Sequence, residues 1–282
     1  MREACAGARA AGGRLGFVPT MGFLHEGHLH LVRVARRSAA RVAMSIFVNP
    51  LQFGPNEDFA RYPRDPERDR RLAESAGVDL LWMPTREAMY PEEPLVTVSP
   101  GPMAQGFEGA VRPGHFAGVL TVVLKLFEVV RPDAAVFGRK DVQQAALVRR
   151  MVSDLNLGVE VVVAPTVREP DGLALSSRNV YLDAAARRRA VLLSRSLAAG
   201  VDAFRSGARD GGAIVAAARA VLDAEAAVAV DYVECVEPAT FAPAARACES
   251  SVLAVAARVG GTRLIDNVAL GDGLEGDVRI PG

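Results

Sequence analysis

The sequence predicts an α/β protein: a Rossmann-like, doubly wound parallel sheet followed by a smaller C-terminal α+β domain. Short apolar runs that resemble buried strands alternate with helical patterns between residues 15 and 165. This alternation is typical of a parallel sheet with right-handed crossovers. Beyond that stretch, two helical patterns precede several strand patterns. We therefore expect two domains, residues 1–166 and residues 167–282.

Composition narrows the class of protein. The chain has 282 residues, half of them hydrophobic, with a formal net charge of zero. No basic stripe suggests a nucleic-acid partner, and no apolar run reaches the roughly 18 residues that span a bilayer. Three cysteines without a CxxC spacing favour reduced thiols. We expect a cytoplasmic protein that binds neither nucleic acid nor membrane. The few residues before the first strand leave open that a natural N-terminal segment is missing.

The first domain is expected to contain five strands. Continuous apolar runs, typical of strands buried on both faces, end at proline, glycine or polar residues. The expected strands are residues 15–18, 42–48, 78–83, 134–137 and 159–165. Apolar spacing of three and four predicts helices at about 27–40, 117–130 and 142–155, with another leading to Gly77. Residues 92–114, rich in Gly and Pro, are expected to be irregular.

The second domain begins after a turn at residues 169–172. Alanine-rich helical patterns follow at about 184–204 and 212–226. Strands are expected at 228–236, 252–259 and 263–265. Helices followed by strands favour an α+β arrangement.

Polar residues follow three of the expected strands directly. They are His25 and His28, Asn49 and Gln52, and Lys140 and Asp141. Ligands bind beyond the carboxyl ends of the strands in doubly wound sheets. The order of elements therefore predicts one ligand-binding rim that contains these residues.

The pattern His25-x-Gly27-His28 is the most informative part of this rim. Three of the four histidines lie within six positions, at the start of an expected helix. A helix N-terminus attracts anions, and imidazoles three apart lie on one side of its first turn. The pair suits a phosphate or a zinc ion, unless the two are ordinary surface histidines. Zinc requires further ligands, and neither HExxH nor a cysteine cluster is present. The sequence also lacks a P-loop and a GxGxxG motif.

Lysine is rare in this chain. Only Lys125 and Lys140 occur, against 31 arginines. A compact ammonium differs from a guanidinium as a phosphate ligand, so a retained lysine is a weak indication of a functional site.

Seven blocks of sequence resemble the pantothenate synthetase (pantoate–β-alanine ligase) family of the His-x-Gly-His nucleotidyltransferase superfamily. These blocks are residues 19–28, 45–53, 61–64, 112–116, 137–144, 175–179 and 263–267, in the family's order. The resemblance extends over essentially the whole chain. It implies that ATP and (R)-pantoate form pantoyl adenylate and pyrophosphate, after which β-alanine attacks to give pantothenate and AMP. It also implies a homodimer and Mg²⁺ carried by the ATP phosphates.

The resemblance assigns roles to individual residues. Residues 1–166 would bind the nucleotide and pantoate, and residues 167–282 would form a lid. His25, His28 and Lys140 would be catalytic, with His28 as the presumed proton donor. Residues that would bind pantoate or β-alanine are Met21, Asn49, Gln52 and Gln144. Those that would bind ATP are Met21, Gly22, Phe23, Leu24, His25, Glu26, Gly27, His28, Gly138, Arg139, Lys140, Asp141, Val167, Leu175, Ser176, Ser177 and Arg178.

Several positions keep two interpretations. Arg112 and His115 would contact a substrate or only support the Pro-Gly loop between them, and Tyr62 would line the site. Asp141 would lie near ATP or cap a helix. Position 139 is an arginine where the family usually has an acidic residue, so we expect residue 139 to act mainly through its backbone. The Asp65/Asp69 region is a candidate for Mg²⁺, although no ligand spacing identifies metal ligands.

Two other functions compete with the ligase. The first is a different His-x-Gly-His nucleotidyltransferase that acts on a phosphorylated substrate. Gln52 and Gln144 would bind a phosphate poorly compared with Arg or Lys, which disfavours it. The second is a nucleotide-binding regulator without turnover, which the intact set of polar positions disfavours.

Overall fold

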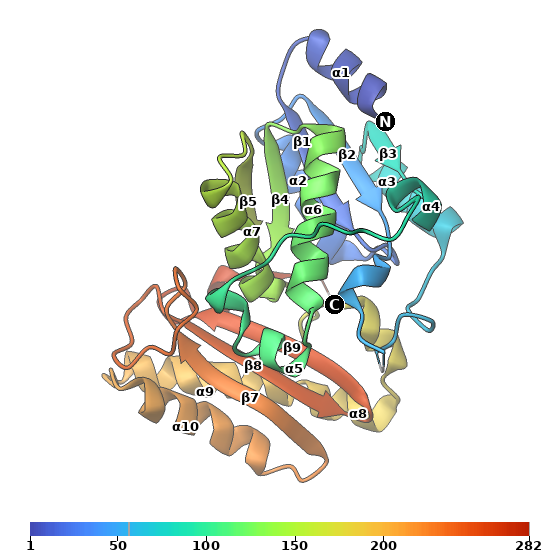
Figure 1. Ribbon diagram of the computed structural model, residues 1–282. Coiled ribbons are helices and arrows are strands. Elements are labelled where there is room, and N and C mark those ends of the chain that lie inside the picture. Colours follow the sequence, from blue (N-terminus) through green and yellow to red (C-terminus); the bar gives the residue numbers. More distant parts are fainter. Residues whose placement is uncertain (56, 282) are drawn as a thin grey trace. The chain divides into compact units, whose positions relative to one another are not determined.

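The computed structural model describes residues 1–55 and 57–281, which form two compact units (Figure 1). The first unit comprises Met1–Gly138 and Gln143–Ala164. The second comprises Arg139–Val142 and Pro165–Gly282, of which residues up to 281 are described. The four-residue segment Arg139–Val142 interrupts the first unit in sequence but belongs to the second unit.

The first unit is built on a five-stranded parallel sheet in the order β3-β2-β1-β4-β5 (Figure 1). Its strands are β1 (Leu15–Thr20), β2 (Arg41–Ile46), β3 (Leu80–Trp82), β4 (Ala134–Gly138) and β5 (Glu160–Ala164). The predicted α/β fold with a parallel sheet is confirmed. The third strand is shorter than expected, because only Leu80, Leu81 and Trp82 pair with β2.

Helices cover both faces of this sheet. Consecutive residues of a strand point to opposite faces, so Phe17 and Val18 of β1 enter separate apolar cores. The Phe17 core is covered by α1 (Arg2–Ala10), α6 (His115–Val130) and α7 (Val142–Asp154). The Val18 core is covered by α2 (Glu26–Arg36) and α3 (Pro66–Ser75). The sequence did not predict α1, which contributes the buried Cys5.

The switch point of the doubly wound sheet lies between β1 and β4. The helix that follows β1 packs on one face, and the helix that follows β4 packs on the other. Within the described chain, β1 and β4 share only two register pairs, Gly16↔Ala134 and Phe17↔Ala135, whereas β1 and β2 share six. Since ligands of such sheets bind at the switch point beyond the carboxyl ends, the residues after Thr20 occupy the favoured place.

Shorter elements fill the connections of the first unit. They are η1 (Pro50–Gln52), α4 (Arg86–Met89), η2 (Pro102–Ala104) and α5 (Glu108–Val111). The last two lie in the segment expected to be irregular. The helix expected from residue 117 begins at His115, directly after Gly114 in a left-handed conformation (φ 83°).

The second unit contains an antiparallel sheet in the order β7-β8-β9. Its strands are β7 (Val228–Val236), β8 (Val252–Val259) and β9 (Thr262–Ala269), and an apolar core joins them to α8 (Ala184–Ala190), α9 (Leu192–Arg205) and α10 (Gly211–Asp223). The predicted α+β character is confirmed. The single helix expected over 184–204 is divided at Val191, and the last strand is longer than the expected 263–265.

Two short parallel strands join the beginning and end of the second unit. They are β6 (Val167–Arg168) and β10 (Val278–Arg279). Short 3₁₀ segments complete it: η3 (Arg139–Asp141), η4 (Ser177–Tyr181) and η5 (Leu274–Gly276). No helix in the described parts of either unit is long and apolar enough to cross a membrane.

Candidate functional site

The loop between β1 and α2 is held by a buried carboxylate. Asp69 of α3 is 1% exposed, and its two oxygens accept the backbone N–H groups of Phe23 (2.7 Å) and Leu24 (2.6 Å). Phe23 has a positive φ of 47°, a conformation that needs support from its surroundings. Asp69 supplies that support, because each of its oxygens fixes one amide of the loop.

Gly22 is required by the same contact. Its φ is +84°, and a Cβ added there would lie 2.8 Å from Asp69 Oδ2 and 2.8 Å from Ile46 Cγ2. A side chain would therefore meet both backbone strain and a steric clash. The glycine lets the loop approach Asp69 closely enough to form its hydrogen bonds.

His25 and His28 cap the first turn of α2 reciprocally. His25 is the N-cap residue, and its Nδ1 accepts the N–H of Gly27 at 3.1 Å. Nδ1 of His28 accepts the N–H of His25 at 3.2 Å. The ring centroids lie 4.1 Å apart. An accepting Nδ1 carries no hydrogen, so in the neutral rings the hydrogen is on Nε2. Both imidazoles are therefore fixed as Nε2–H donors at a helix N-terminus, where an anion is favoured.

A second cluster lies where β2 ends. Asn49, 1% exposed, donates from Nδ2 to Gln52 Oε1 (3.2 Å) and to the Gly118 carbonyl (3.1 Å). Gln52 in turn donates from Nε2 to Met21 Sδ at 3.1 Å. The structure thus brings together Met21, Asn49 and Gln52, which the family resemblance placed in one substrate site. It also shows that the amide of Asn49 is used to orient Gln52.

Tyr90 and Lys125 support this cluster from behind. The Tyr90 hydroxyl donates to Asn49 Oδ1 at 2.9 Å, and burial raises its pKa to about 12. The Lys125 ammonium lies 5.2 Å from the centre of the Tyr90 ring, a cation–π distance. Lys125 therefore supports the packing of Tyr90. Sequence reasoning missed Tyr90, since an isolated tyrosine carries no motif.

Arg112 and His115 support the backbone of Gln52. His115 Nδ1 donates to the Gln52 carbonyl at 2.9 Å, and its Nε2 accepts from Arg112 at 3.0 Å. Arg112 also pairs with both oxygens of Glu57, at 2.9 and 2.6 Å. Burial and the Arg112 charge lower the pKa of His115 to about 4. His115 is thus a neutral group that fixes the position of Gln52. Tyr62 is buried, and its ring packs against the ring of Phe53, the residue after Gln52.

The two glutamines of α7 differ in their surroundings. Gln143 is 3% exposed and ties down the segment before α5: its Nε2 donates to the carbonyls of Met103 and Gly106, and its Oε1 accepts the Glu108 N–H. Gln144 is half-buried. The structural glutamine is therefore Gln143, which leaves Gln144 as the one suited to a ligand.

The proposed magnesium region has structural partners. Asp65 is the N-cap of α3 and accepts the Arg68 N–H at 3.0 Å, while Asp69 holds the histidine loop. Within the described residues, no group of three or more His, Cys, Asp or Glu side chains is arranged to hold a metal ion. Both carboxylates thus have backbone N–H partners: Asp65 at the start of α3 and Asp69 in the loop before α2.

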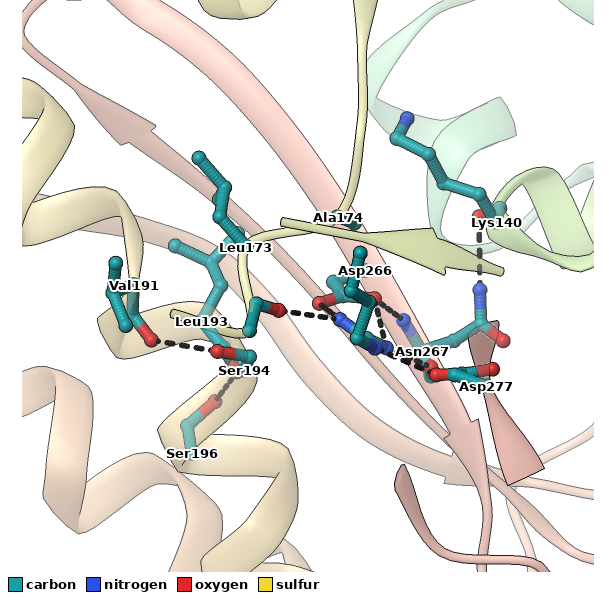
Figure 2. Close-up of polar contacts among 12 residues, drawn as sticks. Lys140, Leu173, Ala174, Val191, Leu193, Ser194, Ser196, Asp266, Asn267 and Asp277 are labelled. Atoms are coloured by element: carbon teal, nitrogen blue, oxygen red, sulfur yellow. Dashed lines mark hydrogen bonds and ion pairs between the residues drawn. The ribbon is translucent and has the colours of Figure 1, made fainter. Parts of the chain in front are cut away.

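In the second unit, Lys140 lies on η3, and this turn is held by β9. Asn267 Nδ2 donates to the carbonyls of Arg139 (2.9 Å) and Lys140 (2.8 Å). Figure 2 shows the Lys140 side chain extending away from Asn267. Its ammonium forms no hydrogen bond or ion pair with any residue that the structure describes. Asp141 is exposed and ends the turn.

Arg139 is paired through its side chain. Its guanidinium donates to Asp272 (2.7 Å) and Asp277 (2.6 Å), near the end of the chain. Asp277 also accepts from Arg168 Nε (2.6 Å), and Arg168 forms a two-point contact with Asp266 (2.6 and 2.9 Å). Asp266 directly precedes Asn267, which donates to the Arg139 carbonyl. The series of contacts therefore returns to Arg139. We call Arg139, Asp277, Arg168, Asp266 and Asn267 the charge ring.

The predicted Ser-Ser-Arg segment follows a tight hairpin. Leu175 N–H donates to the Val167 carbonyl at 2.9 Å, which brings these two predicted residues together. Ser176 is the N-cap of η4 and accepts the Arg178 N–H at 3.3 Å. Ser177 is 7% exposed. Asn179 fixes the hairpin by donating to Glu169 Oε1 and the Ala174 carbonyl.

The first unit is a doubly wound α/β sheet, and helix α2 begins at its switch point with two imidazole donors. Proteins of this class bind anionic ligands beyond the carboxyl ends of their strands. The family described as Pantoate-beta-alanine ligase matches residues 1–269. The chain belongs to this family, and the predicted family and enzyme class, a ligase, are confirmed.

Relatives named pantothenate synthetase match nearly the whole chain. One from Thermobifida fusca is 56% identical, over 92% of this chain and 90% of its own length. One from Thermoanaerobacter sp. (strain X514) is 50% identical, over 94% of each chain.

Solved structures agree. The pantothenate synthetase from Thermus thermophilus has a TM-score of 0.90 at 50% identity, covering 94% of this chain and 97% of that one. A pantoate-beta-alanine ligase from Francisella tularensis, complexed with beta-gamma ATP and beta-alanine, has a TM-score of 0.76 at 31% identity, covering 97% of each chain.

Proposed function

We propose that this chain condenses (R)-pantoate with β-alanine in two steps. ATP and pantoate first give pantoyl adenylate and pyrophosphate, and β-alanine then gives pantothenate and AMP. Membership of the pantoate-beta-alanine ligase family supports this proposal. The observation that carries it is the capped histidine pair at the start of α2. This pair directly follows the loop that contains Met21, the partner of Gln52.

In the first step a pantoate carboxylate oxygen attacks the α-phosphorus, and the bond from that phosphorus to the pyrophosphate oxygen breaks. Negative charge grows on the phosphate oxygens and the leaving group. The Nε2–H groups of His25 and His28 donate to these oxygens, which stabilises the transition state more than the ground state. Because backbone N–H groups fix both rings, the donors need no reorganisation when charge develops.

The remaining loop residues form the nucleotide seat. The loop from Gly22 to His28 shapes the seat, and the dipole at the N-terminus of α2 favours the phosphates. Asp69 is a positioning residue for this seat, because it holds the N–H groups of Phe23 and Leu24.

Met21 and Gln52 form the pantoate site. The Met21 thioether packs against the gem-dimethyl group, and the Gln52 amide binds pantoate oxygens in place of its weak contact to sulfur. Gln144 contributes a second amide. Asn49 takes part indirectly, since its own amide is committed to Gln52, Gly118 and Tyr90. Uncharged amides suit a substrate that carries hydroxyls and a single carboxylate.

Residues of the second unit serve the phosphates. Lys140 supplies a compact positive charge, while Ser176, Ser177 and Arg178 supply hydroxyls and a guanidinium for the leaving pyrophosphate. Arg139, Asp141, Gly138, Val167 and Leu175 contribute through their backbone. The lid role of this unit, the homodimer, the cytoplasmic location and Mg²⁺ carried by ATP remain predictions.

In the second step the neutral amine of β-alanine attacks the acyl carbon of pantoyl adenylate. The carbon–nitrogen bond forms, the bond from the acyl carbon to the bridging oxygen breaks, and AMP leaves with that oxygen. The nitrogen then loses a proton to solvent or to the departing phosphate.

The decisive experiment follows an oxygen atom. The purified chain is given ATP, β-alanine and pantoate labelled with ¹⁸O in its carboxylate, and the products are analysed by mass spectrometry. One ¹⁸O is expected in the phosphate of AMP, with pyrophosphate released and no ADP. Without β-alanine, one pyrophosphate per active site should form rapidly. Formation of ADP, or unlabelled AMP, would refute the adenylate route.

A further inference from the structure

The charge ring lies beneath the turn that carries Lys140. We propose that the charge ring is a positioning device for Lys140: it fixes the backbone on both sides of this residue while leaving its ammonium unpaired. The inference rests on the role proposed above for Lys140 as a phosphate-binding cation.

The backbone argument begins with Asn267. Its Nδ2 donates to the carbonyls of two consecutive residues, Arg139 at 2.9 Å and Lys140 at 2.8 Å. Figure 2 shows the contact with Lys140. The Arg139 carbonyl belongs to the peptide plane before the Lys140 Cα, and the Lys140 carbonyl belongs to the plane after it. Peptide units are planar, so holding both carbonyls fixes both dihedral angles of Lys140. The direction in which its side chain leaves the turn is fixed as a result.

Asn267 is itself held by its neighbours. It is 1% exposed, and its own carbonyl accepts from Arg168 at 3.4 Å. Asp266 Oδ1 accepts the Asn267 N–H at 2.8 Å. Arg168 is fully buried and anchors both Asp266 and Asp277. Burial alone would lower the pKa of Arg168, but Asp266 and Asp277 raise it above its ordinary value. Losing one partner would leave a buried charge uncompensated, so the ring resists partial opening.

The carboxylates of the ring are all paired with arginines. Two guanidiniums, Arg139 and Arg168, face two carboxylates, Asp266 and Asp277, and Asp272 adds a contact at the more exposed end of Arg139. Each of these three carboxylates is bound to a guanidinium of Arg139 or Arg168 and not to the Lys140 ammonium. The ammonium accordingly has no hydrogen-bond or ion-pair partner in the described chain, and it remains available to a phosphate.

The ring also explains the arginine at position 139. Its two terminal nitrogens donate to Asp272 and Asp277, so the side chain of Arg139 has a structural role within the protein. Both carboxylates lie beyond residue 269, where the family match ends. The last residues of the chain therefore supply the counter-charges for Arg139 and connect it to Arg168.

A double-mutant cycle tests the proposal. Asn267→Ala is made in the wild-type chain and in the Lys140→Ala chain, and single-turnover pyrophosphate release is measured in each. We expect Asn267→Ala to slow release by roughly 10- to 100-fold when Lys140 is present, because a displaced group loses its geometry. In the Lys140→Ala background the further loss should be below about twofold, because the two changes remove the same interaction.

Two other variants complete the experiment. Arg139→Gln breaks the ring without deleting the Asn267 contacts. It replaces Asn267→Ala in the experiment if circular dichroism shows that the Asn267→Ala chain is unfolded. The matched control is Glu275→Gln, which removes the exposed Arg205–Glu275 pair from the same C-terminal segment and should leave the rate unchanged.

Equal slowing in both backgrounds would show that the ring acts on the fold generally, and would overturn the proposal. A Lys140→Ala chain with the wild-type rate would overturn it as well. In either case, release of AMP and pyrophosphate by the wild-type chain decides separately whether the proposed function holds.

Discussion

Nδ1 of His28 accepts the backbone N–H of His25 at 3.2 Å, and this contact ties the two histidines of the loop into one capping unit. With the cap that His25 places on Gly27, it fixes which nitrogen of each ring carries hydrogen. In each ring Nδ1 caps the helix, and the proposed function would use Nε2 of the same ring.

Replacing His25 separates these two contributions. Asn is a good N-cap residue, so His25→Asn keeps an acceptor for the Gly27 N–H but lacks the Nε2–H donor. We expect unfolding free energy close to wild type and kcat lower by about 10²- to 10³-fold. His25→Ala should lose a similar factor in kcat and also about 1 kcal/mol of stability. Urea unfolding and steady-state kinetics measure both. A fully active His25→Asn chain would show that the Nε2 donor is not used.

Asp69 is predicted to act through the loop and not through a metal. An Asn at this position keeps one acceptor but turns an amide towards the second backbone N–H. Asp69→Asn should therefore destabilise the protein by roughly 1–3 kcal/mol and lower kcat. Asp65→Asn on the same helix is the control, because Asn caps a helix as well as Asp does. If Mg²⁺ titration restored the activity of Asp69→Asn, a metal role would be indicated instead.

Gly118 permits the close approach of α6 to η1. A Cβ at this position would lie 2.2 Å from the Leu51 carbonyl oxygen and 2.7 Å from the Gln52 nitrogen. We expect Gly118→Ala to cost about 1–3 kcal/mol and to raise KM for pantoate, because η1 must shift. Gly7→Ala in α1 meets no atom within 4 Å and should stabilise by roughly 0.5–1 kcal/mol. An unchanged pantoate KM in folded Gly118→Ala would argue against Gln52 as a pantoate ligand.

His115 should make stability depend on pH. Its pKa is lowered from 6.5 to about 4 by burial and by Arg112. His115 is therefore protonated below pH 6.5 in the unfolded chain but only below about pH 4 in the folded chain. The stabilisation is complete above pH 6.5, falls between these values, and amounts to a few kcal/mol.

The measurement compares wild type with His115→Gln by urea unfolding from pH 7.5 to pH 4.5. The difference in unfolding free energy between the two proteins should shrink as the pH falls. A constant difference would show that the pKa of His115 is the same in the folded and the unfolded chain.

The sequence was sufficient for the sheet and the histidine loop, because both depend on local patterns. Apolar runs bounded by Pro or Gly predicted the strands, and His-x-Gly-His predicted the helix start. The last strand was predicted too short, since Asp266 and Asn267 look like loop residues. They are buried in β9 because Arg168, nearly a hundred residues earlier, compensates their polarity.

Supporting residues were harder to predict. Asp69 and Tyr90 have ordinary local surroundings, and their importance arises from hydrogen bonds to residues 41–46 positions away. Residue 139 was expected to act mainly through its backbone. The side-chain contacts of Arg139 could not be predicted, because Asp272 and Asp277 are more than 130 positions distant. No spacing rule connects such pairs before the chain has folded.

The turn Arg139–Val142 leaves the parallel sheet yet belongs with the C-terminal unit. The chain therefore cannot be divided into modules by a single cut. A fragment ending at Ala164 would contain Lys140 but lack Arg168, Asp266, Asn267 and Asp277, which hold its turn. Chimeras between relatives face the same constraint. The C-terminal half taken from one relative must be compatible with residues 139 and 140 of the other, because it supplies their hydrogen-bond and ion-pair partners.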